Sequence, residues 1–170
     1  DLKPRGNIGI AFTYNEPLVG YEYVRDCAKL VEKNGMKSVV VTNGCFCEEP
    51  MLELLDYINA FNIDLKGFTQ GFYEEIGGDM ETVKKFIQLA SKKSHIEITT
   101  LIIPDENDTE REISELSKFI SSINKDIPLH VSRFFPCYKM NLKSPTEVRK
   151  VYELTDIARK QLNYVYEGNC

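Results

Sequence analysis

The sequence predicts an α/β protein with a parallel sheet, and two observations support that fold class. Short segments rich in β-branched and aromatic residues recur along the 170-residue chain. Between them lie segments whose apolar residues recur with helical spacing. Regular alternation of strand and helix favours parallel strands joined by right-handed crossovers. Two architectures fit, a doubly wound sheet or part of a (β/α) barrel.

The expected strands follow in chain order. They are residues 8–13, 38–42, 61–65, 96–103, 129–134 and 164–166. The first strand runs into Asn15, Glu16 and Pro17 and not into a glycine-rich phosphate loop. This weakens the alternative of a nucleotide-binding doubly wound sheet.

Five helices are expected between the strands, and three carry a boundary signal. Gly35 is a C-cap for the first helix, and Asp108 or Thr109 is an N-cap for the fourth. A capping box is expected to begin the fifth helix, with Ser144 as N-cap and Glu147 three residues later. The apolar faces of the five helices begin at Val24, Leu52, Val83, Ile113 and Val148.

Composition narrows the functional classes. The net charge is −5, and lysines alternate with acidic residues, which is typical of a solvated surface and argues against a nucleic-acid partner. No apolar run approaches the roughly 20 residues that span a bilayer. Five cysteines in a chain with a good core argue against a disulfide framework and favour the cytoplasm. We expect one domain over residues 1–170, cut at its N-terminus, because Asp1 is not a normal start.

Polar or special residues follow five consecutive strands. The segments are Asn15–Glu16–Pro17, Thr42–Asn43–Gly44, Asp64–Leu65–Lys66, Thr99–Thr100 with Pro104, and Ser132–Arg133–Phe134. Ligands of parallel α/β folds bind at the carboxyl ends of strands. The sequence therefore predicts one shared ligand site.

Each of these segments also has a purely structural interpretation. Asp64 and Lys66 point to the same face of a strand, where they could hold a zwitterion or simply pair with each other. Glu16 could be a helix-entry acid, Asn43 part of an ordinary turn, and Arg133 a partner of a nearby acid. The combination in this order is more specific than any one member.

The order of these motifs resembles a known family. NEP, TNG, DLK, a TTLIIP strand and SRFxP are similar to radical S-adenosylmethionine enzymes of the pyruvate formate-lyase-activating type, and most similar to the AmmeMemoRadiSam system branch. The resemblance covers residues 8–169. It implies a partial (β/α)6 TIM-like barrel whose first strand and cluster loop are missing here.

The resemblance also implies which residues bind S-adenosylmethionine. Asn15 and Glu16 would receive the methionyl ammonium, Thr42 and Asn43 would lie near its carboxylate, and Asp64 and Lys66 would lie at the same end. The strand that holds Thr100 would line the ribose side. Arg133 and Phe134 would lie near the adenine.

The activity that the resemblance implies needs a 4Fe–4S cluster together with S-adenosylmethionine. A 5′-deoxyadenosyl radical would abstract hydrogen from a glycine of a protein partner or from another substrate, with flavodoxin or ferredoxin as electron donor. The C-x3-C-x2-C cluster motif is absent, so its cysteines are expected upstream of Asp1. We therefore expect no catalytic or metal-binding residue in this chain, and no activity from it alone.

Two further departures leave the substrate and a cation site open. Relatives carry an aspartate where this chain has Val41, and a histidine where it has Phe135. Two other functions fit the residues: a lyase with Lys66 as a Schiff-base amine, and a binding module without catalysis. The strand at residues 8–13 would have an unpaired edge, which predicts self-association.

Overall fold

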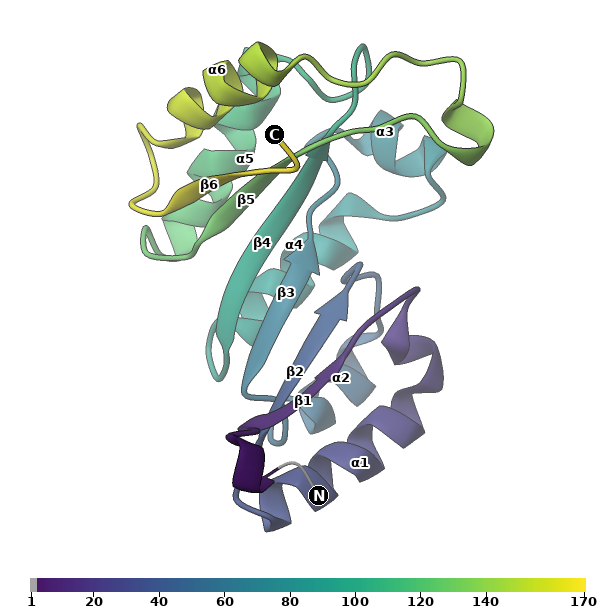
Figure 1. Cartoon of the computed structure of the whole chain (residues 1–170), viewed down its shortest axis with the longest axis vertical. Coiled ribbons are helices and arrows are strands. Elements are labelled where there is room, and N and C mark those ends of the chain that lie inside the picture. The colour runs from purple at the N-terminus through teal and green to yellow at the C-terminus, as the bar shows by residue number, and fades with distance from the viewer. Residues whose placement is uncertain (1–2) are drawn as a thin grey trace. The chain divides into compact units, whose positions relative to one another are not determined.

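The computed structural model describes residues 3–170, and within them strands and helices alternate as the sequence predicts (Figure 1). The strands are β1 (Gly9–Phe12), β2 (Lys37–Thr42), β3 (Ala60–Asp64), β4 (His95–Ile102), β5 (Leu129–Arg133) and β6 (Val165–Gly168). The α-helices are α1 (Tyr21–Lys33), α2 (Glu48–Leu54), α3 (Gln70–Glu75), α4 (Met80–Ala90), α5 (Glu110–Ile123) and α6 (Val148–Ala158). The strands form one parallel sheet in chain order, which confirms the predicted α/β class.

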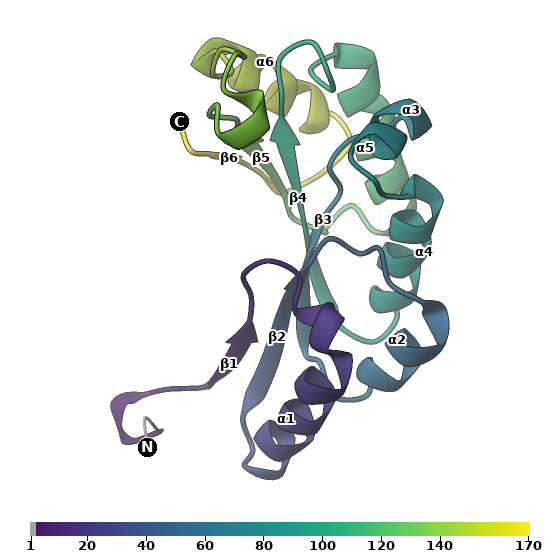
Figure 2. The same ribbon diagram turned by 90° about the vertical axis from the view of Figure 1, so that its right-hand side faces the viewer.

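The chain divides into two compact units. The first unit is Asp1–Asp64 with Thr82–Ile96, and the second is Leu65–Glu81 with Glu97–Cys170. Each has strands of its own and helices that cover one face of those strands (Figure 2).

In the first unit, β2 pairs in parallel with β1 and β3, with Gly9 opposite Lys37 and Val39 opposite Ala60. Helices α1, α2 and most of α4 cover one face of these strands (Figure 2). Phe61 of β3 meets Phe86 of α4 edge to face, with ring centres 5.5 Å apart. The fully buried core of this unit includes Ala28, Val40, Leu54, Ile63, Val83 and Ile87.

In the second unit, β5 pairs in parallel with β4 and β6, with Leu129 opposite both Ile98 and Val165. Burial alternates along β4, because every second side chain turns toward the helices. Its core joins strand residues to the inner faces of α5 and α6. The fully buried members are Ile98, Ile102, Leu116, Ile120, Leu129, Val131, Val151 and Leu154.

The structure confirms two of the predicted helix boundaries and contradicts one. Thr109 caps α5 by accepting the Glu112 N–H at 3.2 Å, and Gly35 follows α1 with φ at +66°. The capping box at Ser144 is wrong, because α6 begins at Val148 and its N-cap, Glu147, makes no side-chain cap hydrogen bond. Helix α3 was not expected, since six residues show too little periodicity.

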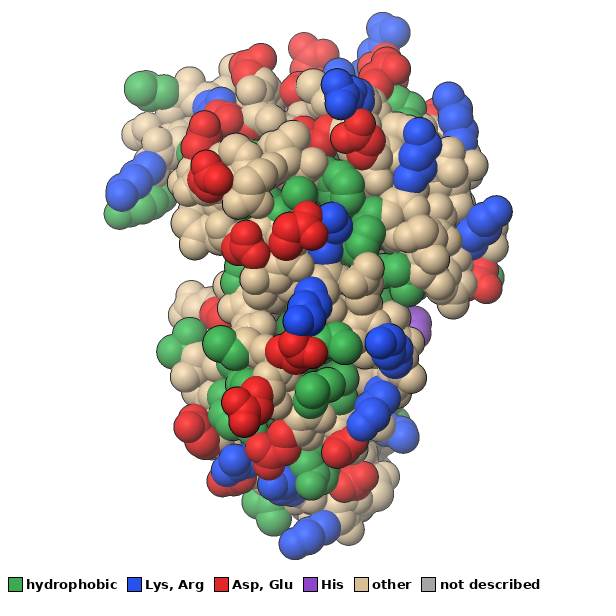
Figure 3. Space-filling model, turned by 180° about the vertical axis from the view of Figure 1, so that it is seen from behind, with side chains coloured by type: hydrophobic (Ala, Val, Ile, Leu, Met, Phe, Trp, Pro, Cys, Tyr) green, Lys and Arg blue, Asp and Glu red, His purple; other side chains and the backbone are tan. Residues whose placement is uncertain are grey.

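The surface agrees with the charge pattern of the sequence. On the face drawn in Figure 3, lysine and arginine side chains are interspersed with acidic ones. Within residues 3–170, no helix is long and apolar enough to cross a membrane. Strand β1 lies at one end of the sheet, and the exposed fractions of Ile8 and Ile10 are 79% and 44%. Self-association through this edge stays a prediction.

Candidate functional site

The Glu16 carboxylate joins the loop after β1 to the end of β2. Its Oε1 accepts hydrogen bonds from Leu18 N–H at 3.0 Å and from the Thr42 hydroxyl at 2.9 Å, and its Oε2 accepts one from Asn43 N–H at 2.7 Å. A carboxylate offers about four acceptor positions, so Oε2 can accept one more bond from a ligand. Glu16 is also the N-cap of the 3-10 helix Pro17–Gly20. It therefore has the expected helix-entry role and, in addition, binds the end of β2.

The backbone before Glu16 adopts an uncommon conformation. Tyr14 and Asn15 both have positive φ, at +70° and +51°. A positive φ is uncommon in residues other than glycine, and two in succession persist only where the surrounding structure fixes them. The three hydrogen bonds to Glu16 provide that constraint directly after the turn.

The turn after β2 is ordered by its own side chains. Thr42, which is 2% exposed, accepts the Gly44 N–H at 3.2 Å, and the exposed Asn43 accepts the Cys45 N–H through Oδ1 at 2.8 Å. The first unit thus brings Glu16, Thr42 and Asn43 into direct contact. Asn15, the remaining predicted residue of this loop, is exposed beside them.

The Asp–x–Lys segment alternates in burial as the sequence predicts. Ile63 and Leu65 are fully buried, while Asp64 and Lys66 are half-buried. Asp64 and Lys66 therefore turn away from the apolar core. A carboxylate and an ammonium two residues apart can bind the two ends of a zwitterion, although an ion pair alone would show the same alternation.

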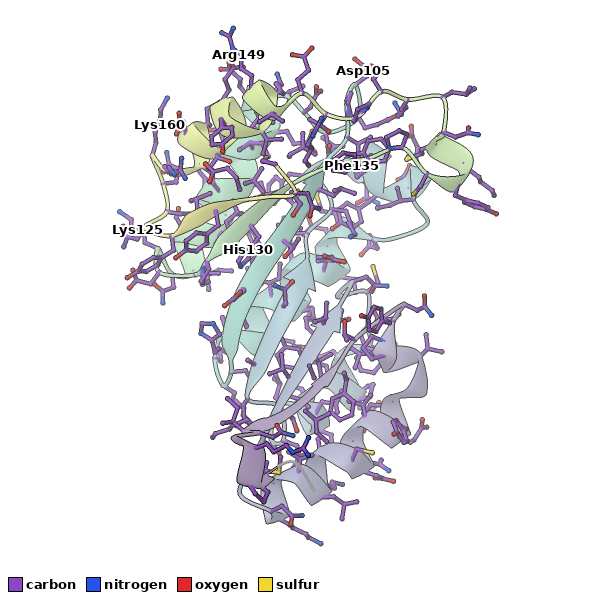
Figure 4. The ribbon with its side chains drawn as sticks, viewed as in Figure 1. Asp105, Lys125, His130, Phe135, Arg149 and Lys160 are labelled. Atoms are coloured by element: carbon purple, nitrogen blue, oxygen red, sulfur yellow. The ribbon has the colours of Figure 1, made fainter. Side chains whose placement is uncertain are left out.

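The end of β5 and the segment after it place Arg133, Phe134 and Phe135 in three different environments. Arg133 Nε donates to Thr146 O at 2.6 Å, and its guanidinium carbon lies 4.6 Å from the centre of the Phe135 ring. Phe135, labelled in Figure 4, is 51% exposed, whereas Phe134 is 4% exposed and packs with Phe72 and Ile103. The ring available beside Arg133 is therefore Phe135.

Thr100 lies on the covered face of β4. Buried and half-buried residues alternate along β4, and Thr100 is buried like Ile98 and Ile102. Its Oγ1 has no hydrogen-bond partner among the described residues. Its neighbour Thr99 is half-buried on the opposite face, so Thr99 is better oriented than Thr100 for a ligand on the face without helices.

The buried polar side chains of the second unit that were not predicted include Tyr73, Asn107, Glu112 and Thr146. Thr146 donates its hydroxyl to Ile102 O at 2.5 Å and accepts Phe134 N–H at 3.3 Å, so it links the ends of β4 and β5. The spacing Thr109–x–x–Glu112 could have indicated Glu112 as a capping-box member. In fact the Glu112 side chain bonds the backbone of Phe68.

Glu112 makes the stability of the fold depend on pH. Burial raises the pKa of this carboxyl above its usual value, and the hydrogen bond from Phe68 N–H opposes that rise. The unfolded chain loses this proton first, so the contribution of Glu112 to the stability of the wild type falls as pH rises from about 4.3 through the folded pKa. We expect Glu112→Gln to remove this fall.

The measurement is urea unfolding of wild type and Glu112→Gln at a series of pH values. The free energy of unfolding of the wild type should decrease relative to the variant as pH rises. Glu110→Gln, on the exposed side of the same helical turn, controls for the loss of charge near the helix start. A difference independent of pH would contradict the prediction.

Comparisons with known proteins agree on a family and a fold. The sequence pattern of the Radical SAM superfamily matches residues 1–117. An uncharacterised protein of Methanocaldococcus jannaschii is 35% identical over 164 residues, which are 95% of this chain and 49% of that protein. The chain therefore spans about half the length of that curated relative.

Two solved structures resemble the fold. A domain of pyruvate-formate lyase-activating enzyme from Bacteroides vulgatus matches with a TM-score of 0.80 and 19% identity, over 95% of this chain and 99% of that one. SuiB of Streptococcus suis bound to S-adenosylmethionine matches with a TM-score of 0.75 and 15% identity, over 99% of this chain and 41% of that one. Another SuiB structure holds the precursor peptide SuiA. At these identities the likeness shows the fold alone.

Proposed function

The chain belongs to the Radical SAM superfamily, whose members use S-adenosylmethionine and a 4Fe–4S cluster, and on that premise we propose that its strand-end residues bind S-adenosylmethionine. The single observation that carries this is the Glu16 carboxylate, held at the junction of two strand ends with acceptor capacity left on Oε2. A hydrogen bond from an ammonium group to a carboxylate is charge-assisted and about twice as strong as one between neutral groups. We assign it to the methionyl ammonium.

The remaining contacts follow from the position of each residue. Asn15 would adjoin the ammonium, and Thr42 and Asn43 would lie near the methionyl carboxylate. Asp64 and Lys66 would bind the same end of the ligand, and Thr100 would lie in the strand that lines the ribose. Arg133 and Phe134 would lie near the adenine, where the exposed ring of Phe135 adds a flat apolar surface beside the guanidinium.

The cysteines of the chain do not fit the cluster. Three thiolates must converge on it, yet residues 3–170 place no three Cys, His, Asp or Glu side chains where together they could hold a metal ion. Cys27 is half-buried, and Cys45, Cys47, Cys137 and Cys170 are exposed. We therefore propose that the cluster cysteines lie outside residues 1–170, in a C-x3-C-x2-C segment of the full-length protein.

The proposal extends to the reaction, its substrate and its electron donor. In a full-length protein with a reduced cluster, S-adenosylmethionine would supply radical chemistry that removes hydrogen from a substrate, at the expense of one electron from the cluster. We propose a glycine on a protein partner as that substrate. The fold of the pyruvate-formate lyase-activating domain and the peptide bound to SuiB support a polypeptide substrate. We propose an electron donor such as flavodoxin or ferredoxin, and a cytoplasmic location.

The test uses the full-length protein, prepared without oxygen. Calorimetry should show S-adenosylmethionine bound at one site, and a low-potential reductant should release 5′-deoxyadenosine, measured by chromatography. Binding without release would favour a non-catalytic module, and a borohydride-trapped adduct at Lys66 would favour the lyase. No binding at millimolar ligand would overturn the proposal.

A further inference from the structure

Three buried side chains of the second unit hold the backbone of residues 66–68, directly after the Asp64–Leu65 step. They are Tyr73, Asn107 and Glu112, whose exposed fractions are 2%, 1% and 5%. Leu65 N–H still donates to Thr99 O at 2.9 Å, as in a strand ladder. Beyond Leu65, the N–H and C=O groups of Lys66 and the N–H group of Phe68 bond to side chains instead.

Asn107 fixes the carbonyl side of Lys66. Its Nδ2 donates to Lys66 O at 2.6 Å and to Leu101 O at 2.8 Å, and its Oδ1 accepts Ile103 N–H at 2.7 Å. Both N–H donors of the amide are therefore used. One side chain thus ties Lys66 to the end of β4.

Tyr73 and Glu112 fix the rest of the segment. The Tyr73 hydroxyl accepts Lys66 N–H at 3.1 Å, and Glu112 Oε1 accepts Phe68 N–H at 2.6 Å. A Cβ on Gly67 would lie 2.6 Å from Phe72 Cδ1 and 3.0 Å from Glu112 Oε1, so only glycine fits between them. Both backbone groups of Lys66 are bonded, and the residue that follows it is enclosed.

We propose that Asn107 and Tyr73 are positioning residues for Lys66, fixing the backbone from which its ammonium reaches the methionyl end of S-adenosylmethionine. The inference rests on the proposed function. A lysine ammonium lies at the end of a flexible four-carbon stem, so a mobile backbone would add to the positions that it samples. Binding sites depend on such supporting residues for the placement of groups that touch the ligand.

A double-mutant cycle on S-adenosylmethionine affinity tests the proposal, measured by calorimetry on the full-length protein. Tyr73→Phe removes the hydroxyl that accepts Lys66 N–H and keeps the ring, and Asn107→Ala removes all three bonds of the amide. We expect each to weaken affinity about 5- to 10-fold, and Lys66→Met to weaken it about 10-fold. In the Lys66→Met background, the effect of Tyr73→Phe should vanish. Residues in contact show such coupling, whereas independent effects add.

The matched control is Ser117→Ala, which removes a buried hydroxyl that donates to Ile113 O at 2.6 Å within α5. It should leave affinity unchanged. An equal loss from Tyr73→Phe in both backgrounds would overturn the inference, because the hydroxyl would then act without Lys66. If Asn107→Ala does not fold, Tyr73→Phe, which keeps the ring, decides the question. Failure of the wild type to bind would instead overturn the proposed function.

Discussion

Replacing Glu16 with alanine is expected to abolish S-adenosylmethionine binding and to lower the free energy of unfolding by about 3 kcal/mol. The carboxylate accepts hydrogen bonds from Leu18 N–H, the Thr42 hydroxyl and Asn43 N–H, and Thr42 is buried. A hydrogen bond to a charged group contributes about 1.5–3 kcal/mol, and relaxation of the exposed loop recovers part of the loss. Calorimetry measures the binding, and urea unfolding measures the stability.

Two further variants sharpen the interpretation of Glu16. Glu16→Gln keeps one acceptor oxygen but replaces the other with an NH₂ group, so its losses should lie between those of wild type and alanine. Glu22→Ala removes an exposed carboxylate from the first turn of α1 and should leave ligand binding intact. A folded Glu16→Ala protein with unchanged affinity would remove Glu16 from the site.

Gly9→Ala is expected to destabilise the fold by about 3 kcal/mol. A Cβ at this position would lie 2.1 Å from Lys37 O and 2.9 Å from Lys37 C. Both atoms are backbone, so no side chain can move aside. The pairing of Gly9 with Lys37 and the hydrogen bond from Lys37 N–H to Ile8 O would both have to shift. Urea unfolding gives the change in free energy.

Gly71→Ala is the matched control for Gly9. Gly71 lies in α3, and a Cβ there would meet nothing within 4 Å. The same methyl group should therefore leave stability unchanged or raise it by about 0.5–1 kcal/mol, because alanine loses less conformational freedom than glycine in a helix. Equal stabilities of the two variants would contradict the close approach at Gly9.

Most of the fold could be predicted because the apolar periodicity of each long element agrees with its final environment. The predicted start of α6 was wrong because of long-range hydrogen bonds. Thr146 N–H donates to Phe134 O at 3.1 Å, and the Thr146 hydroxyl donates to Ile102 O. These bonds hold residue 146 outside the helix and override the local capping signal.

The contacts of Glu16 were predictable, because strand ends alone determine which of these residues lie close together. The contacts of Glu16 with Thr42 and Asn43 join the ends of two adjacent strands, as expected. The burial of Phe134 and the exposure of Phe135 were not predictable, because side-chain alternation stops being reliable where β5 ends. Asn107 lies 41 residues from Lys66 in sequence, and nothing local distinguishes it from a surface loop asparagine.

The three donors that converge on Glu16 have a consequence for the thermodynamics of the proposed ligand binding. An oxygen already locked in place before any ligand arrives loses little further freedom when a cation docks against it. The loop loses its conformational entropy during folding, when Glu16 forms its hydrogen bonds with Leu18, Thr42 and Asn43. On the proposed assignment, the methionyl ammonium would therefore bind a carboxylate that the fold has already oriented.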